Sequence, residues 1–538
     1  MINDSIPLLS ILALLPLLGA LVLTCVRGAA ARVVGLCFAF ATTVLGVCAF
    51  VLGLGTHLSE TLPWIRVIGA FYALELDPMS AVMVLLTVIL TPLVLIAEWH
   101  VGDAEGARWS TRTFFALALA LEGLSLLVFL ASDVLLFYVM FEATLIPMYF
   151  MISGFGGPER AAAAVKFLLF SLAGGLVMLV GVAGLYAVSA GAGEPSFLIR
   201  DLMALDLGGG IGHWLFAAFF FAFAVKAPMA GLHTWLPDTA EQATAGSSTM
   251  LVGILDKIGT FGMIKICLTI FPEASHWATP VILVWAMVSM FYGALMALGS
   301  PDLLRFVSYT SVSHFGFMVF GVFALTTQSL SGSIFYMLNH GFSTAAMFLV
   351  VGFLVKRRGT AAIEAYGVAI HDPGELLSLV DNDIVFYVVS LGFIVATIGV
   401  NIVANFVSAA FDLSNVNPKR ISFRVGGIVA VVASIVVTPW NLYGSPAAIT
   451  YFLGSLGALL GPSFGILVID YFYFKRARID LRDLYSPGRD GRYYYQHGIN
   501  MNALIAFIPA AIIALCIALV PVPLLQTLAP FSWFIAAP

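Results

Sequence analysis

The segment AAAAVKFLLFSLAGGLVMLVGVAGLYAVSA, residues 161–190, contains a single charged side chain, that of Lys166. About 20 consecutive apolar residues are enough for a helix to cross the roughly 30 Å hydrocarbon core of a bilayer. Stretches of this kind fill most of the chain of 538 residues, in which 61% of residues are hydrophobic, 10% are charged and the mean hydropathy is +1.03. Because these values lie far outside the range of soluble globular proteins, the sequence predicts an all-α, polytopic transmembrane bundle.

Apolar runs bounded by charged residues, proline or glycine predict about fifteen full spans. The runs lie near residues 6–26, 33–55, 78–97, 113–131, 134–153, 161–190, 215–231, 245–271, 279–299, 303–325, 328–355, 384–411, 425–438, 446–474 and 501–521. A polar stretch from Lys356 to Asp383 separates the last four from the others. We expect a multi-pass protein of a bacterial cytoplasmic membrane, surrounded by lipid and without a nucleic-acid partner.

Cysteine spacing bears on metal and redox chemistry. The cysteines lie scattered within apolar runs, with neither a CxxC pair nor the His/Cys spacing of a metal site. We interpret them as core residues and expect no metal site in this chain. They are Cys25, Cys37, Cys48, Cys267 and Cys516.

Ionisable side chains lie well inside the predicted spans, where a charge costs roughly 2.5 to 3.5 kcal/mol at mid-bilayer. Such residues usually face a partner or a hydrated cavity, and a proton relay is a leading explanation. Simpler interpretations stay open for two of them, because Lys265 can reach the interface from a span end and His340 can be a satisfied core donor. The ionisable residues inside the spans are Glu142, Lys226, Lys257, Lys265, His314 and His340.

Lys226 lies where a helix is expected to break. Pro228 removes a backbone donor two residues later, and broken helices at membrane depth usually line a cavity. The pKa of a buried lysine is lowered by desolvation and raised by a nearby carboxylate, so a small movement of the partner can release or capture a proton. We expect Glu142 to face Lys226, and the following HTWLPDTAEQA, residues 233–243, to form a loop at the membrane surface.

The segments that contain these residues resemble the antiporter-like M subunit of bacterial respiratory complex I, the proton-pumping NADH:quinone oxidoreductase. The resemblance covers residues 1–365. It implies a half-channel in which Glu142 pairs with Lys226, while Lys257, His314 and His340 continue a proton path. The segments are FYVMFEATLIPMYF (137–150), FAVKAPMAGLHTWLPDTAEQA (223–243), LDKIGTFGMIK (255–265), SYTSVSHFGFMVFG (308–321) and LNHGFSTAAMF (338–348).

The same resemblance implies other membrane subunits of complex I as partners, protons as the transported species, and a non-redox subunit that binds no cofactor of its own. It also implies a second broken helix with a charged residue, for the exit half-channel. Nothing in this sequence matches that feature.

Residues 366–538 resemble a different family, the C-terminal third of the nucleobase:cation symporters. The resemblance lies in ATIGVNIVANFVSAAFDLSNVNPKRISFRVGG (396–427), TPWNLYGSP (438–446) and GPSFGILVIDYFYFKRARIDLRDLY (461–485). It implies that Asn405 and Asn401 bind a nucleobase-like substrate, since an amide both donates and accepts hydrogen bonds. An asparagine that bridges two helices is the simpler alternative.

Two incomplete transporters fused near residue 366 are therefore our main interpretation: a proton-translocation module followed by a permease fragment. We also expect Asp470, near a span end, to pair with Lys475 or Arg476. The alternatives are an M-like subunit with diverged C-terminal helices, a working nucleobase importer, a non-functional chimera and a non-transporting scaffold. The buried charges disfavour the scaffold.

Overall fold

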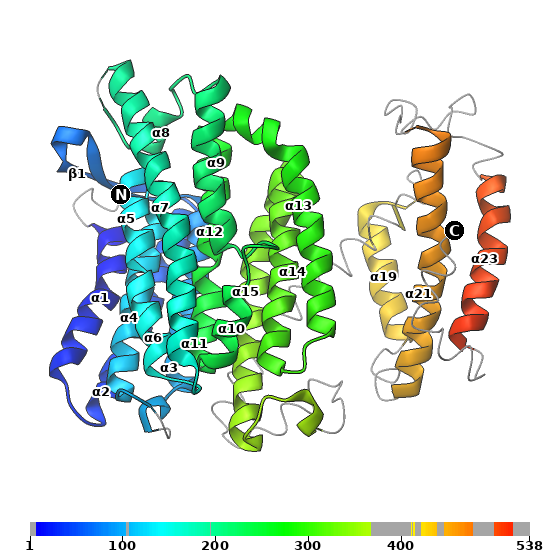
Figure 1. Ribbon diagram of the computed structural model, residues 1–538, viewed down its shortest axis with the longest axis horizontal. Coiled ribbons are helices and arrows are strands. Elements are labelled where there is room, and N and C mark those ends of the chain that lie inside the picture. The colour runs from blue at the N-terminus through cyan, green and yellow to red at the C-terminus, as the bar shows by residue number, and fades with distance from the viewer. Residues whose placement is uncertain are drawn as a thin grey trace. The chain divides into compact units, whose positions relative to one another are not determined.

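The computed structural model describes residues 7–103, 107–193, 195–366, 410, 413–414, 421–437, 446–476 and 500–519. The chain forms two compact units, Met1–Ile402 and Val403–Pro538. Within the described residues, 11 helices are long and apolar enough to cross a membrane. The predicted polytopic helical bundle is confirmed (Figure 1).

Helices dominate the first unit, and most of them run side by side along the bundle (Figure 1). They are α1 Leu8–Cys25, α2 Ala30–Gly53, α3 Pro78–Ala97, α4 Thr111–Leu130, α5 Val134–Ala143, α6 Leu145–Gly154, α7 Arg160–Ala192, α8 Ile199–Leu202, α9 Gly209–Lys226, α10 Trp235–Gln242, α11 Ala245–Met250, α12 Lys257–Gly262, α13 Pro272–Leu298, α14 Leu303–Phe323 and α15 Thr327–Arg358.

Side chains at the N-termini fix where several of these helices begin. Asp77 accepts a hydrogen bond from Ser80 N at 2.8 Å and caps α3, while Asp133 accepts one from Leu136 N at 2.9 Å and caps α5. Asp302 does the same for α14. These acceptors satisfy backbone N–H groups that have no partner within the helix.

A β-hairpin interrupts the helical pattern between α2 and α3. Strand β1, Leu58–Ile65, pairs antiparallel with β2, Ala70–Leu76, and the register shifts between Pro63 and Ile65. Gly69 makes the turn with a φ of +69°, a left-handed conformation that glycine adopts without a steric penalty. Hydropathy did not predict this hairpin, because its residues fall between two strongly apolar spans.

Three of the expected spans are discontinuous, and the first of them, residues 134–153, forms α5 and α6 with Thr144 between them. Helix α9 ends at Lys226 and α10 begins at Trp235, so the predicted break at Pro228 is present. Residues 245–271 form α11 and α12, separated by the π-helical stretch Leu251–Leu255 and followed by a second one, Met263–Leu268. Residues 233–243 were expected to be a loop. They form mainly the helix α10, because Trp235 and Leu236 are buried and anchor it against the bundle.

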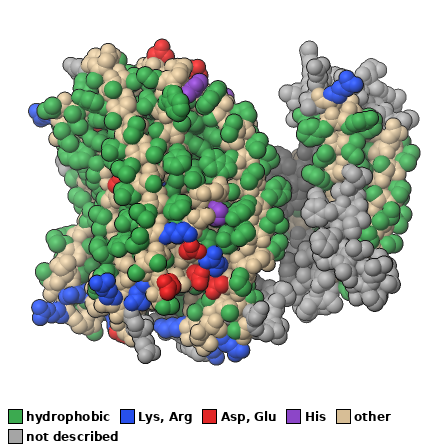
Figure 2. All heavy atoms as spheres, in the orientation of Figure 1, with side chains coloured by type: hydrophobic (Ala, Val, Ile, Leu, Met, Phe, Trp, Pro, Cys, Tyr) green, Lys and Arg blue, Asp and Glu red, His purple; other side chains and the backbone are tan. Residues whose placement is uncertain are grey.

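Buried residues of the first unit form one continuous apolar core, to which α3, α4 and α14 contribute many members. Hydrophobic side chains also cover the flank of this unit, while charged side chains gather toward its lower end in the view of Figure 2. This distribution suits a bilayer, where lipid contacts the apolar flank and the polar ends reach water. The cysteine interpretation is mostly wrong: Cys267 is buried, but Cys25, Cys37, Cys48 and Cys516 are exposed on the outer faces of their helices.

The described helices of the second unit are α19 Phe423–Val437, α21 Pro446–Ile469 and α23 Met501–Leu519. Ala458 of α21 and Ala514 of α23 form a small buried cluster of their own. Asp470 forms an ion pair with Lys475, which confirms the pairing expected from the sequence. The predicted boundary between residues 365 and 366 stays a prediction, because residues 367–409 lie outside the described part of the chain.

Candidate functional site: buried charges and imidazoles at the broken helices

Glu142 lies near the end of α5, where Thr144 interrupts the helix before α6 begins at Leu145. Its carboxylate packs against α7 at Gly175. A Cβ atom at residue 175 would lie only 1.7 Å from Glu142 Oε1, so the absence of a side chain at this glycine makes room for the carboxylate. Within the described residues, Oε1 has no hydrogen-bond partner, although the carboxylate interacts electrostatically with Lys226.

Lys226 is the last residue of α9 and is only 1% exposed. Its ammonium group faces aromatic rings, with Nζ 5.5 Å from the ring centroid of Phe141 and 5.2 Å from that of Phe167. Nζ has no hydrogen-bond partner among the described residues. Glu142 and Lys226 thus interact electrostatically at a distance longer than that of a hydrogen bond, and their predicted role as a proton-exchanging pair stays a prediction.

At the break after α9, hydrogen bonds outside the regular helical pattern pair the backbone groups. Pro228 supplies no N–H, and the Trp235 side chain donates from Nε1 to the Val225 carbonyl at 3.2 Å. Met229 N donates to the Ala224 carbonyl at 3.1 Å. Since buried backbone groups must be paired, these bonds allow the helix to end inside the bundle.

Lys257 begins α12 and is completely buried. Its Nζ donates to the Val252 carbonyl at 2.8 Å and lies 2.7 Å from His340 Nδ1. The preceding π-helical turn accompanies this arrangement, and π-helical turns occur frequently at functional sites. The ring centroid of Phe315 lies 4.7 Å from Nζ and closes another side of the ammonium group.

His340 on α15 and His314 on α14 lie next to each other, with ring centroids 5.1 Å apart. Within the described residues, His340 Nε2 and His314 Nδ1 have no hydrogen-bond partner. The structure therefore brings Lys257, His340 and His314 together, and it places Lys226 and Glu142 around the end of α9. The simpler interpretation of His340, a core histidine satisfied by the protein, fits Nδ1, which contacts Lys257, but not Nε2, which has no partner among the described residues.

Lys265 has a different setting from the other buried lysines. It forms an ion pair with Asp77, the carboxylate that caps α3. This pair joins the π-helical stretch Met263–Leu268 to the start of α3, so the lysine is held by a carboxylate.

Two fully buried carboxylates inside the predicted spans were not among the predicted site residues. Asp256 immediately precedes Lys257, and Glu122 lies in the middle of α4; both are 0% exposed. The sequence contained the signal, because each is an acidic residue inside a long apolar run, the same criterion that selected Glu142.

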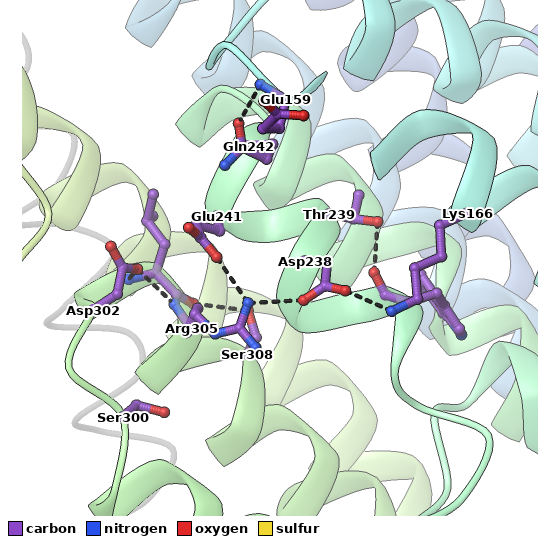
Figure 3. A network of polar contacts seen from close by, with 12 residues as sticks. Glu159, Lys166, Asp238, Thr239, Glu241, Gln242, Ser300, Asp302, Arg305 and Ser308 are labelled. Atoms are coloured by element: carbon purple, nitrogen blue, oxygen red, sulfur yellow. Dashed lines mark hydrogen bonds and ion pairs between the residues drawn. The ribbon is translucent and has the colours of Figure 1, made fainter. Parts of the chain in front are cut away.

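A network of ion pairs fixes the short helix α10 to its neighbours (Figure 3). Asp238 accepts from Lys166 of α7 at 2.5 Å and from Arg305 Nη1 of α14 at 2.7 Å. The same Arg305 Nη1 lies 2.7 Å from Glu241 Oε2. Burial acts to raise the pKa of Asp238, but the hydrogen bonds from Lys166 and Arg305 outweigh it and hold the pKa below its ordinary value.

Replacing Asp238 by asparagine removes the anion that Lys166 and Arg305 share. Because the pKa of Asp238 is lowered in the folded protein, the stabilisation is present above the ordinary carboxyl pKa, about 3.9, and is lost as pH falls through the folded value. We expect Asp238→Asn to lower the thermal unfolding midpoint of the detergent-solubilised protein by roughly 1 to 3 °C at neutral pH. The difference should shrink toward zero in strongly acidic buffer.

Tryptophan fluorescence during a temperature ramp measures both midpoints. Glu241→Gln is the matched comparison, since it weakens only one contact of Arg305 and leaves Lys166 paired with Asp238. Its effect should be the smaller one. Equal midpoints for the parent and Asp238→Asn at neutral pH would show that the network does not stabilise α10.

Asn401 and Asn405 lie outside the described residues, so their predicted role in binding a nucleobase-like substrate stays a prediction. Within the described part of the chain, no group of three or more His, Cys, Asp or Glu side chains is arranged to hold a metal ion.

Comparison with known families gives a consistent match. The family model described as "NADH:quinone oxidoreductase/Mrp antiporter, TM" matches residues 131–438, a range that contains every residue proposed for the proton path. This range continues well beyond residue 366. None of the comparisons supports the resemblance of residues 366–538 to nucleobase symporters, nor a fusion of two transporters near that residue.

Curated relatives agree with this match. Subunit M of the NADH-quinone oxidoreductase of Mycobacterium tuberculosis (strain ATCC 25618 / H37Rv) is 41% identical over 402 residues, which cover 68% of this chain and 73% of the relative. The corresponding subunit of Rhodobacter capsulatus is 34% identical over 446 residues, covering 79% and 82%. The second alignment is longer than residues 1–365, so it also extends past the expected boundary.

Among solved structures, a chain of "Respiratory complex I from Thermus thermophilus with bound NADH" matches with a TM-score of 0.63 and 29% identity, covering 78% of this chain and 87% of that chain. The archaeal membrane-bound sulfane sulfur reductase shares the fold at 20% identity, with a TM-score of 0.61. The chain therefore belongs to the NADH:quinone oxidoreductase/Mrp antiporter membrane family, among the M subunits of NADH-quinone oxidoreductase.

Proposed function

We propose that this chain translocates protons across the bacterial cytoplasmic membrane as a subunit of a respiratory NADH:quinone oxidoreductase. The proton path consists of Glu142, Lys226, Lys257, His340 and His314. The redox chemistry takes place in other subunits, and this chain contributes proton-carrying side chains without a cofactor of its own. Other membrane subunits of the complex are its partners.

The contact between Lys257 and His340 carries the proposal. Lys257 Nζ lies 2.7 Å from His340 Nδ1, and the two side chains are 0% and 1% exposed. An amine and an imidazole at this distance can share a proton directly, whereas two groups that served only to hold helices together would not need to be ionisable. A charge in this position is also expensive, so a structural role alone would favour apolar packing.

Further support comes from the unpaired polar atoms around this contact. Lys226 Nζ, His314 Nδ1 and His340 Nε2 lie buried without a protein partner among the described residues. Buried polar groups are normally hydrogen-bonded, to the protein or to ordered water. Unpaired polar atoms of this kind on α9, α14 and α15 suit proton movement through a hydrated interior.

Lys257→Met tests this function. Methionine preserves the length of the side chain but cannot bind a proton, so NADH-driven proton uptake into inverted membrane vesicles should fall about fivefold or more. The acidification is followed with a pH-sensitive dye, and NADH oxidation is recorded in the same vesicles. Intact assembly is checked by native gel electrophoresis of the solubilised complex.

The control is Lys356→Met, the same substitution at an exposed lysine in the last turn of α15. It should leave proton uptake at the parental level. An assembled Lys257→Met complex that acidifies vesicles as fast as the parent would refute a proton path through Lys257.

A further inference from the structure

Asp256 is a completely buried carboxylate that the proposed path does not yet use. It is 0% exposed, and neither of its carboxylate oxygens has a hydrogen-bond partner among the described residues. Its backbone occupies the junction between the π-helical stretch Leu251–Leu255 and α12. A carboxylate in this setting is costly to bury, and it needs a cationic partner to remain ionised.

The packing of α12 against α9 places Asp256 beside Lys226. A Cβ atom at Gly259 would lie 2.5 Å from Ala227 N and 2.7 Å from the Phe223 carbonyl, so the backbone of α12 approaches the end of α9 very closely. Residues three apart lie on the same face of a helix, so Asp256 lies on the face that contacts the end of α9. Lys226 is the residue at which α9 ends.

Electrostatic interactions connect Asp256 with both lysines. Lys226 is attracted to Asp256 as well as to Glu142. Lys257 is likewise attracted to Asp256, and its hydrogen-bonding contacts, the Val252 carbonyl and His340, bring no negative charge. Asp256 therefore interacts electrostatically with both lysines, whereas Glu142 interacts with Lys226.

We propose that Asp256 is a proton-carrying residue that passes the translocated proton from Lys226 to Lys257. This inference rests on the proposed function. While both lysines are charged, neither can accept a proton from the other, so a carboxylate that attracts both can receive the proton from Lys226 and hold it until Lys257 is neutral. A carboxylate fills that role, because it binds one proton and releases it again without any change of bonding elsewhere.

Each transfer conserves atoms and charge. An N–H bond of the Lys226 ammonium breaks and an O–H bond forms on Asp256 by relay through water in the hydrated interior, since the two groups make no direct hydrogen bond, and a neutral amine and a neutral carboxylic acid result. The O–H bond then breaks as the neutral amine of Lys257 takes the proton and Asp256 becomes a carboxylate again. Lys226 regains a proton from the side of Glu142, and Lys257 delivers its own to His340 Nδ1, 2.7 Å away.

The test uses the assembled complex in inverted membrane vesicles, with proton uptake and NADH oxidation measured together. Asp256→Asn preserves the shape of the side chain but cannot carry a proton, and Asp256→Glu restores the carboxylate. Glu122→Gln is the matched control, because Glu122 is also 0% exposed and, among the described residues, Thr91 acts on it while Lys226 and Lys257 do not. Lys226→Ala serves as the reference for a blocked path.

We expect proton uptake to fall about fivefold or more in Asp256→Asn, to recover to at least about half of the parental rate in Asp256→Glu, and to stay near the parental rate in Glu122→Gln. Parental uptake in Asp256→Asn together with a large loss in Lys226→Ala would overturn this inference and leave the proposed function intact. An equal loss in Glu122→Gln would also overturn it, since any buried carboxylate would then have the same effect. Parental uptake in Lys226→Ala would instead refute the proposed function.

Discussion

Lys226→Ala should reduce NADH-driven proton uptake about tenfold or more, because the end of α9 then lacks the group that exchanges protons with its acidic neighbours. Lys226→Arg should reduce it to a similar extent. Arginine keeps the positive charge but does not release its proton in a protein, so it can satisfy Glu142 and Asp256 electrostatically without transferring a proton. The two variants together separate proton exchange from charge pairing.

Both variants are measured by vesicle acidification per NADH oxidised, alongside native gels that report the amount of assembled complex. Lys265→Arg is the control, since Lys265 is paired with Asp77 and an arginine can keep that ion pair. Its proton uptake should equal that of the parent. If Lys226→Arg also pumped at the parental rate, Lys226 would act as a fixed charge and the proposed path would have to bypass it.

Gly175→Ala should also reduce proton uptake about tenfold, although the new methyl group lies on a different helix from the charged residues. A Cβ atom at this position would lie 1.7 Å from Glu142 Oε1 and 2.5 Å from Glu142 Cδ. Such contacts are impossible, so the carboxylate must move away. Because it is the flexible end of a side chain, its displacement costs little stability, and the helices should still assemble.

Gly191→Ala is the control for this prediction, because it makes the same substitution in α7 where nothing lies within 4 Å of the added Cβ atom. The unfolding midpoint of Gly175→Ala should change little, while vesicle acidification falls. Parental acidification in the assembled Gly175→Ala complex would show that the position of the Glu142 carboxylate is not critical.

The membrane class and the candidate site residues could be predicted from the sequence because each depends on local features. A run such as residues 161–190 suits a spanning helix whatever its neighbours are. Lys226 and Pro228 together indicated a break, since a proline removes a backbone donor wherever it lies in a helix. Asp256 and Glu122 meet the same kind of local criterion, since each is an acidic residue inside a long apolar run.

The comparisons do not support the C-terminal interpretation, for a related reason. Residues 366–538 were assigned to a second family from short segments, while the family match to residue 438 rests on a much longer range. Apolar helices share composition across unrelated membrane proteins, so short similarities in them carry limited information about ancestry.

The sequence by itself determined that this protein is a polytopic helical membrane protein with ionisable groups inside its spans and a broken helix at Pro228, because hydropathy and backbone chemistry act locally. Only the tertiary structure decided which of these groups meet. Lys257 and His340 are 83 residues apart and come within 2.7 Å, and Asp77 and Lys265 are 188 residues apart and form an ion pair. Such contacts depend on how the helices pack, and membrane helices pack through shape and small residues such as Gly175 and Gly259, which the hydropathy of a span does not reveal.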